Sequence, residues 1–199
     1  MVDVTKYKVF PTIIYKFEHY PTINDYKNME VHISETGKKY KYASHTADDL
    51  HLLSYFMELR EKIYDVAKQY LNNLEYEYDK LEITGMWGNK LYQGDTHPPH
   101  TNSNNILSGV YYLKTGKNSS PIHFFDPRPQ ATVWRPRNKP NWDNGSMVGF
   151  NAIQGVGFIF PSWLMHWVPP TQGERISISW YIIVRGNYGE PDTLQNAYI

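Results

Sequence analysis

The part of the sequence that most restricts the fold begins near residue 80, where short candidate strands alternate with turn residues. Gly, Pro, Asn and Asp separate these strands, at intervals of roughly 8–20 residues. Many short strands at this spacing are typical of a β-sandwich or barrel. The candidate strands are residues 81–93, 106–114, 121–125, 131–134, 147–153, 156–161 and 175–184. We therefore expect a mainly β fold for the second half of the chain.

One long helix is expected before these strands, over residues 47–74, because apolar residues recur there at helical spacing. Thr46 with Asp49 three residues later resembles a capping box. Residues 12–18 alternate and predict a strand, whereas residues 20–46 are polar and irregular. We interpret the helix as a buttress for the sheet and assign no chemistry to it.

Composition narrows the class of function. The chain has 199 residues, which suits one domain. Its 20 basic and 20 acidic side chains give a formal net charge of zero, so we expect no nucleic-acid partner. It has no cysteine, so a metal site would need His, carboxylate or amide ligands. Because we find no signal peptide and no membrane-spanning run, we expect a cytoplasmic protein. Nothing in the sequence indicates an oligomeric state.

Two segments contain histidines that could bind a metal. In GDTHPPHTNSNN (residues 94–105), His100 and Asn102 are two residues apart, so both side chains point the same way in an extended chain. The alternative is a polar turn whose side chains cap backbone groups. In FPSWLMHWVPP (residues 160–170), His166 lies within an apolar run. A single histidine in that setting is more often a core residue than a ligand.

The segment ERISISWYIIV (residues 174–184) alternates regularly between polar and apolar side chains. Arg175, Ser177, Ser179 and Tyr181 share one face. That face is either exposed to water or lines a barrel interior. In the second case, Arg175 would be a buried cation that needs a carboxylate partner, and Ser177 could donate to the same anion.

Three segments together resemble a known family: HTNSNNILSGVYYL (residues 100–113), PIHFFDPRP (residues 121–129) and FPSWLMHWVPPTQGERISISW (residues 160–180). They are similar to the 2-oxoglutarate/Fe(II)-dependent oxygenases, in the prolyl-hydroxylase-like branch common in phage genomes. The resemblance runs from about residue 83 to residue 184. It implies a double-stranded β-helix, a jelly-roll or cupin-like barrel, with one long buttressing helix. We expect a single domain, with an N-terminal strand and helix (1–80), a barrel core (81–186) and a C-terminal tail (187–199).

The same resemblance implies roles for individual residues. His100 and His166 would bind Fe(II), and Arg175, assisted by Ser177, would bind the 5-carboxylate of the co-substrate 2-oxoglutarate. Tyr111 would lean over the co-substrate. The implied reaction consumes O2, releases succinate and CO2, and hydroxylates an amino-acid side chain, either peptidyl prolyl-like or in a small metabolite. The location would be the host cytoplasm if a phage encodes the protein.

One residue departs from the family pattern. Most members supply a carboxylate two residues after the first histidine, where this chain has Asn102. Its amide oxygen could be a weak third metal ligand, or Asn102 could stand aside for water or a halide. Asp126, Asp95 or His97 could replace it. We favour Asn102 at or next to the metal.

Two other functions fit the sequence. A barrel of the same fold could bind a metal or ligand without turnover, and Asn102 favours this reading. A carbohydrate- or peptide-binding β-sandwich is suggested by the Trp and Tyr content and by the irregular segment 126–145. That alternative leaves the order of His100, His166 and Arg175 unexplained.

Overall fold

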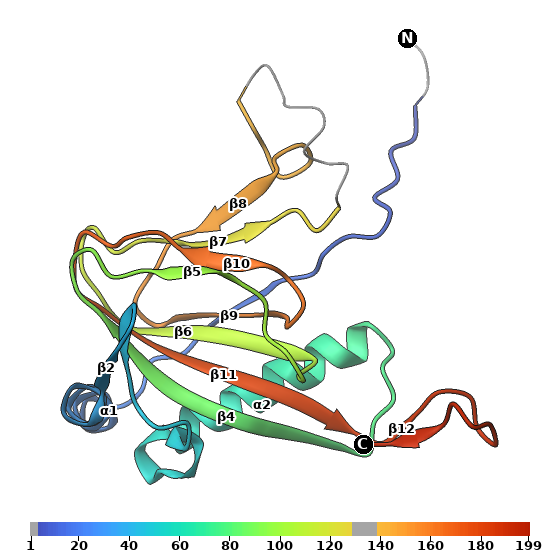
Figure 1. Cartoon of the computed structure of the whole chain (residues 1–199), viewed down its shortest axis with the longest axis horizontal. Helices are drawn as coiled ribbons and strands as arrows, with labels where there is room; N and C mark the ends of the chain where they lie inside the picture. Colours follow the sequence, from blue (N-terminus) through green and yellow to red (C-terminus); the bar gives the residue numbers. More distant parts are fainter. Residues whose placement is uncertain (1–3, 129–138) are drawn as a thin grey trace.

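The computed structural model describes residues 4–128 and 139–199, and two antiparallel sheets form its barrel. The seven-stranded sheet has the order β1-β9-β6-β11-β4-β3-β2, and the four-stranded sheet has the order β5-β10-β7-β8. Figure 1 shows the smaller sheet on one side of the larger sheet and the helices on the other. This is the double-stranded β-helix predicted from the sequence. The predicted strand 131–134 lies outside the described residues.

The elements have the following bounds. The strands of the large sheet are β1 (Tyr15–Glu18), β2 (Lys38–Tyr40), β3 (Ala43–His45), β4 (Lys80–Leu91), β6 (Leu107–Thr115), β9 (Val156–Pro161) and β11 (Arg175–Arg185). The strands of the small sheet are β5 (His97–His100), β7 (Ile122–Phe125), β8 (Met147–Phe150) and β10 (His166–Val168). The helices are α1 (Ile23–Thr36), η1 (Leu50–Leu52), η2 (Ser54–Phe56) and α2 (Met57–Asn73). A separate two-stranded sheet joins β12 (Asn187–Tyr188) to β13 (Ala197–Tyr198).

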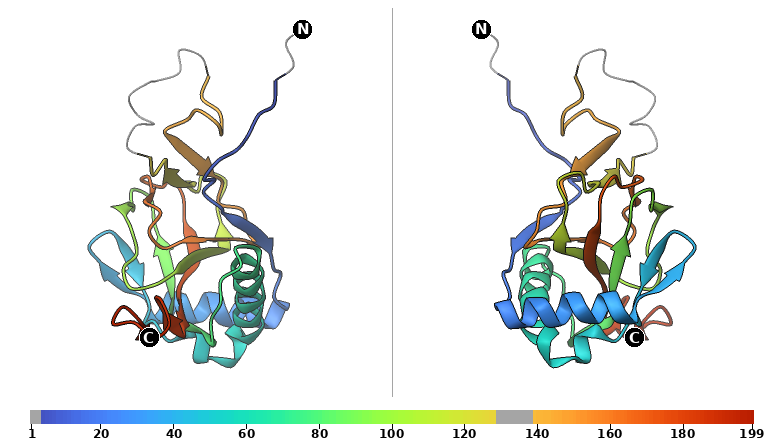
Figure 2. Two further views of the ribbon diagram at one scale, coloured as in Figure 1. Left: turned by 90° about the vertical axis from the view of Figure 1, so that its right-hand side faces the viewer. Right: turned by 90° about the vertical axis from the view of Figure 1, so that its left-hand side faces the viewer.

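The alternation of β11 separates the main core from the barrel interior. Ile176, Ile178 and Trp180 are fully buried in the core between the large sheet and the helices. Figure 2 shows both α1 and α2 on this face of the sheet, with α1 running across the direction of α2. Arg175 and Ser177 are also buried, with 2% and 1% of their surface exposed, although they belong to the opposite face. The polar face of β11 therefore lines the interior and is not the water-exposed face of an open sheet.

The N-terminal third differs from the sequence expectation. Residues 20–46, expected to be irregular, contain α1 and the β2–β3 hairpin. Helix α1 buries only Met29 and Ile33, so its polar composition hides the helical pattern. Its N-cap is Thr22, whose hydroxyl accepts a hydrogen bond from the backbone N–H of Asp25.

The predicted long helix begins later than expected. Residues 50–56 form the two 3₁₀ turns, and α2 starts at Met57. Thr46 does not cap the helix, because its hydroxyl accepts a hydrogen bond from the backbone N–H of Gly88 in the sheet. Strands β5 and β10 were not predicted. They have only four and three residues, and β5 contains two prolines, so neither has a recognisable strand pattern. No helix in the described ranges is long and apolar enough to cross a membrane.

Gly109 on β6 allows Trp180 to pack directly against the neighbouring strand. A Cβ atom at Gly109 would lie 2.1 Å from Cζ2 of Trp180, far inside van der Waals contact. We expect Gly109→Ala to lower the free energy of unfolding by about 1–3 kcal/mol, because the buried indole cannot move without disturbing the core. Urea denaturation measures this change. In Gly173→Ala the nearest atom is 4.0 Å away, and the change should stay within about 0.5 kcal/mol. Equal stability of the two variants would contradict the packing argument.

Candidate active site

His100 and His166 meet on neighbouring strands of the small sheet. They are direct partners in the antiparallel pairing of β5 with β10, and their ring centroids are 4.3 Å apart. The Nδ1 atom of His100 lies 2.7 Å from the carbonyl oxygen of Pro98, and Nδ1 of His166 lies 2.8 Å from that of Leu164. If each Nδ1 donates its proton to this carbonyl, each Nε2 keeps a free lone pair. This is the usual arrangement of a metal-binding histidine.

Burial keeps His166 uncharged. Only 6% of its surface is exposed, and it packs against Phe160 with ring centroids 4.8 Å apart. Burial lowers the pKa of His166 to about 4, with a smaller contribution from the nearby His100. The neutral form, which is the form that binds a metal, therefore predominates at neutral pH.

A cavity of about 180 Å³ between the two sheets contains most of the predicted site. It is lined by the predicted residues His100, Asn102, His166, Arg175 and Ser177. The polar residues His45, Asn89, His97 and Ser179 line it as well. Residues from three separate segments of the sequence (100–102, 166 and 175–177) therefore meet at one place.

Arg175 is a buried cation without a carboxylate partner in the cavity. Its Nη1 donates to the carbonyl oxygen of Ser120 at 2.9 Å, and its guanidinium carbon lies 4.9 Å from the centre of the Tyr112 ring. Its Nε is buried and has no hydrogen-bond partner among the described residues. Burial lowers the pKa of Arg175, yet guanidinium groups remain charged in proteins. Such a cation favours an anionic ligand that presents a planar carboxylate.

The sequence analysis did not identify Asn89, a buried polar residue that lines this cavity. Asn89 on β4 is buried, and its amide nitrogen donates to the hydroxyl of Ser179 at 2.9 Å. The indole N–H of Trp87 donates to the amide oxygen of Asn89 at 3.1 Å. The signal available in the sequence was the single asparagine of the predicted strand 81–93. Buried amides are usually hydrogen-bonded.

Asn102 occupies the place of the missing carboxylate. Its backbone N–H donates to the carbonyl oxygen of Ser162 at 2.9 Å, and its side-chain oxygen accepts a hydrogen bond from the hydroxyl of Tyr181 at 3.2 Å. In the described part of the chain, no three His, Asp or Glu side chains are close enough together to hold a metal. Among the described residues, a protein ligand set would therefore consist of the two histidines and, at most, a neutral amide.

Of the three alternative third ligands, Asp95 and Asp126 lie outside the cavity, whereas His97 lines it. Asp95 pairs with Lys39 at 2.5 Å, and Asp126 pairs with Arg128 at 2.6 Å in a local turn. Neither carboxylate lines the cavity, so neither fits as a ligand. His97 does line the cavity, and burial, together with the nearby Arg175, lowers its pKa to about 3.

The expected contact of Tyr111 with a co-substrate does not fit its position. Tyr111 is opposite Ile178 on β11, on the core face of the sheet, and its hydroxyl donates to the carbonyl oxygen of His19. The adjacent Tyr112 is opposite Ser177 and contacts Arg175 instead. A register irregularity between Ile176 and Ser177 sets this pairing, and it was not readable from the sequence.

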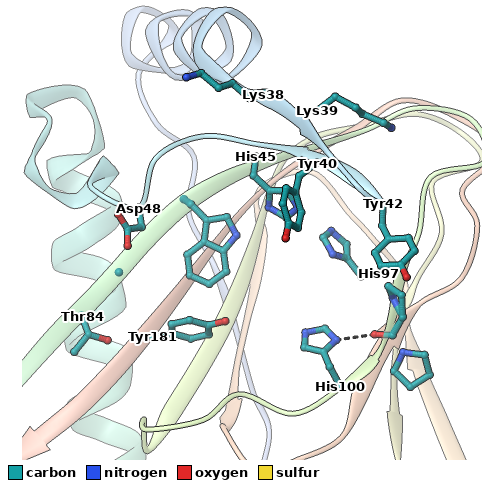
Figure 3. Close-up of a pocket in the computed structure, with 14 residues that line it drawn as sticks. Lys38, Lys39, Tyr40, Tyr42, His45, Asp48, Thr84, His97, His100 and Tyr181 are labelled. Carbon is teal, nitrogen blue, oxygen red and sulfur yellow. Dashed lines mark hydrogen bonds between the residues drawn. The ribbon is translucent and has the colours of Figure 1, made fainter.

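A larger cavity of about 710 Å³ adjoins the first one, beneath the β2–β3 hairpin. Figure 3 shows Tyr40, Tyr42, His97 and Tyr181 around it, with His100 at its inner end. Five residues line both cavities: His45, Trp87, His97, His100 and Tyr181. The histidine pair can therefore be reached from this wider space.

Comparisons with known proteins agree with this geometry. Residues 85–181 match the model of the family described as "Putative 2OG-Fe(II) oxygenase". No curated protein sequence matches the chain. The matched region contains every residue that lines the smaller cavity except His45.

Solved structures share the fold at low sequence identity. A prolyl-4-hydroxylase from Pseudomonas putida aligns with a TM-score of 0.64 and 13% identity, covering 88% of this chain and 94% of that protein. The non-heme α-ketoglutarate-dependent epimerase SnoN from nogalamycin biosynthesis aligns at 0.64 and 12%, covering 92% and 83%. A Trichoplax adhaerens prolyl hydroxylase, in complex with a peptide fragment of the hypoxia-inducible factor oxygen degradation domain, aligns at 0.59 and 12%, covering 84% and 82%. At these identities the likeness concerns the fold alone.

Proposed function

We propose that the protein is an Fe(II)- and 2-oxoglutarate-dependent dioxygenase, because residues 85–181 match the model of the 2OG-Fe(II) oxygenase family. The observation that carries this proposal is the buried Arg175 in the same cavity as the His100–His166 pair. This arrangement supports a metal at the two histidines and a dicarboxylate at Arg175. His100, Asn102, His166, Arg175 and Ser177 form the proposed site.

The donor set fits a divalent iron. Two imidazoles whose Nδ1 atoms contact backbone carbonyls would hold the metal through Nε2, and they would leave it able to bind co-substrate and dioxygen. When bound, Fe(II) would supply the redox chemistry by which O2 converts 2-oxoglutarate to succinate and CO2 and delivers one oxygen atom to a substrate C–H bond.

The chain's own residues bind and orient the reactants. Arg175 has free donor capacity at Nε, and it would pair with the 5-carboxylate of 2-oxoglutarate. Ser177 lies on the same face, two residues along the strand, and its hydroxyl would donate a hydrogen bond to the same carboxylate. The apolar walls formed by Ile122, Phe160 and Val168 would limit water around the reacting groups.

We place the primary substrate in the larger cavity. Its aromatic lining (Tyr40, Tyr42, Trp87 and Tyr181) suits an amino-acid side chain, and its volume of about 710 Å³ leaves room for the residues that flank it in a peptide. The prolyl hydroxylases among the similar structures support a peptidyl side chain as substrate. A free amino acid or a small metabolite is the second candidate, because the larger cavity has ample volume for it as well.

Turnover of 2-oxoglutarate tests the proposal. The protein would be incubated with Fe(II), ascorbate, 2-oxoglutarate and O2, with and without a proline-containing peptide library, and succinate would be quantified. We expect succinate release that the right peptide stimulates, and a product heavier by one oxygen atom. His100→Ala should release no succinate above background. Binding of metal and 2-oxoglutarate with no turnover for any substrate class would instead favour the inactive barrel.

A further inference from the structure

The larger cavity contains a carboxylate that stands well apart from Arg175. Asp48 is the only acidic residue among the described residues that line this cavity. Its side chain lies over Gly85 on β4, since a Cβ atom at Gly85 would be 3.6 Å from Cβ of Asp48. Gly85 is opposite Tyr181 in the pairing of β4 with β11, whereas Leu91, six residues along β4, is opposite Arg175. Six strand residues span about 20 Å, so the carboxylate does not serve as a partner for the buried guanidinium.

The carboxylate of Asp48 is held in place by its backbone and is available to a ligand. The backbone N–H of Met86 donates to the carbonyl oxygen of Asp48 at 2.8 Å, and Asp49 pairs with Met86 in an isolated parallel β-bridge. None of the ion pairs among the described residues includes Asp48. A fixed carboxylate of this kind, facing a cavity, favours a cationic ligand.

Two aromatic rings beside Asp48 strengthen this preference. Trp87 is two residues from Gly85 on the same face of β4, and its ring centroid lies 4.6 Å from that of Tyr181, with the planes tilted by 59°. Both side chains are partly exposed and line the cavity. Figure 3 shows Tyr181 between Asp48 and His100. Because the face of such a ring attracts a cation within about 6 Å of its centre, the rings and the carboxylate favour the same kind of ligand.

The lysines of the same cavity lie on another side of it. Figure 3 shows Lys38 and Lys39 on the hairpin side, apart from Asp48. Lys39 is already paired with Asp95 at 2.5 Å. A ligand can therefore place a cation at Asp48 without approaching these ammonium groups closely.

We propose that the primary substrate is cationic, and that its ammonium or guanidinium group binds between the carboxylate of Asp48 and the rings of Trp87 and Tyr181. This inference rests on the proposed function, because it names the substrate class of that same site. The reacting C–H bond of the substrate then lies toward His100, which lines both cavities. A lysyl or arginyl residue of a peptide and the corresponding free amino acid share this chemistry.

The test is a calorimetric titration of the protein loaded with Mn(II) and 2-oxoglutarate, so that binding is measured without turnover. The probes are three peptides that differ only in the residue next to a central proline, which is lysine, norleucine or glutamate. Norleucine keeps the apolar stem of lysine but lacks its charge. We expect the lysine peptide to bind about tenfold more tightly than the norleucine peptide, and the glutamate peptide to bind more weakly than either. Titration of free lysine and free norleucine distinguishes a free amino acid from a peptide as the source of the cation.

Substitutions at Asp48 make the test specific. Asp48→Asn should weaken binding of the lysine peptide by roughly five- to tenfold and leave the norleucine peptide unaffected. Asp48→Lys should reverse the preference, so that the glutamate peptide binds more tightly than the lysine peptide. Asp49→Lys is the matched control, because Asp49 is an exposed neighbour that lines neither cavity. It should keep the preference of wild type.

The outcomes separate the substrate class from the enzymatic function. Suppose that wild type binds Mn(II) and 2-oxoglutarate, but binds lysine and norleucine probes equally or binds no lysine-containing probe up to millimolar concentrations. The cationic substrate is then wrong and the proposed function stands. A preference for lysine that persists in Asp48→Asn would also overturn the inference, because the cation would bind elsewhere. If the metal-loaded protein binds no 2-oxoglutarate, the proposed function fails and the inference fails with it. Circular dichroism of each variant checks that the fold is retained.

Discussion

Replacing Arg175 by methionine is expected to weaken 2-oxoglutarate binding by at least about 100-fold. The loss follows from two charge-assisted hydrogen bonds to the distal carboxylate, each worth about 1.5–3 kcal/mol. Isothermal titration calorimetry of the Fe(II)- or Mn(II)-loaded protein without O2 measures this change. Arg175→Lys should recover only part of the affinity, because an ammonium group lacks the planar fork of the guanidinium.

The same substitution should not lower the free energy of unfolding of the ligand-free protein. Arg175 is a buried cation whose Nε has no partner among the described residues, and replacing such a charge by an apolar side chain of similar size is often neutral or stabilising. The control is Arg185→Met at the other end of β11, where Arg185 is half-buried and pairs with Glu82. That variant should bind 2-oxoglutarate as wild type does. Unchanged 2-oxoglutarate binding in Arg175→Met would remove Arg175 from the site.

His166→Gln is expected to reduce Fe(II) affinity on the order of 1,000-fold. The metal loses one of only two imidazole ligands, and even residues that merely support such ligands contribute about 10–100-fold. Glutamine keeps much of the volume of the ring, so the contact with Phe160 changes less than it would with alanine. Equilibrium dialysis against a chromophoric chelator measures the affinity.

His123→Gln is the matched control for the metal experiment. His123 lies on β7, the strand next to His166, and is opposite Trp167. It is absent from the lining of the cavity, so we expect its replacement to leave Fe(II) affinity within about twofold of wild type. Equal losses in the two variants would indicate a general effect on the small sheet and not the loss of a ligand.

The sequence predicted the barrel better than the elements around it. Strand β9 was predicted at its observed bounds, and the predicted end of β11 differs by one residue. These strands are long, with apolar runs or strict alternation, so local pattern and tertiary burial agree. Helix α1 was missed because it buries only Met29 and Ile33. Its place is set by contacts with the sheet, which no local pattern contains.

From strand geometry alone, the sequence predicts which site residues lie together only when they are two apart on one strand. Arg175 and Ser177 share a face because they are two apart on β11. The pairing of His100 with His166 depends on the register of β5 with β10, two short strands that the sequence does not identify. Tyr111 was expected to contact the co-substrate. A register irregularity next to Ser177 instead places Tyr112 opposite Ser177 and Tyr111 opposite Ile178, on the core face. The hydrogen bond from Tyr181 to Asn102 likewise joins residues that only the closed barrel brings together.

The most direct test of the proposed site is the absorption spectrum of the protein with Fe(II) and 2-oxoglutarate in the absence of O2. A 2-oxo acid chelated to Fe(II) gives a weak visible charge-transfer band. We predict that this band forms with wild type, disappears in His166→Gln, and requires far more 2-oxoglutarate in Arg175→Met. A folded wild-type protein that retains no iron and gives no band at any 2-oxoglutarate concentration would contradict the account.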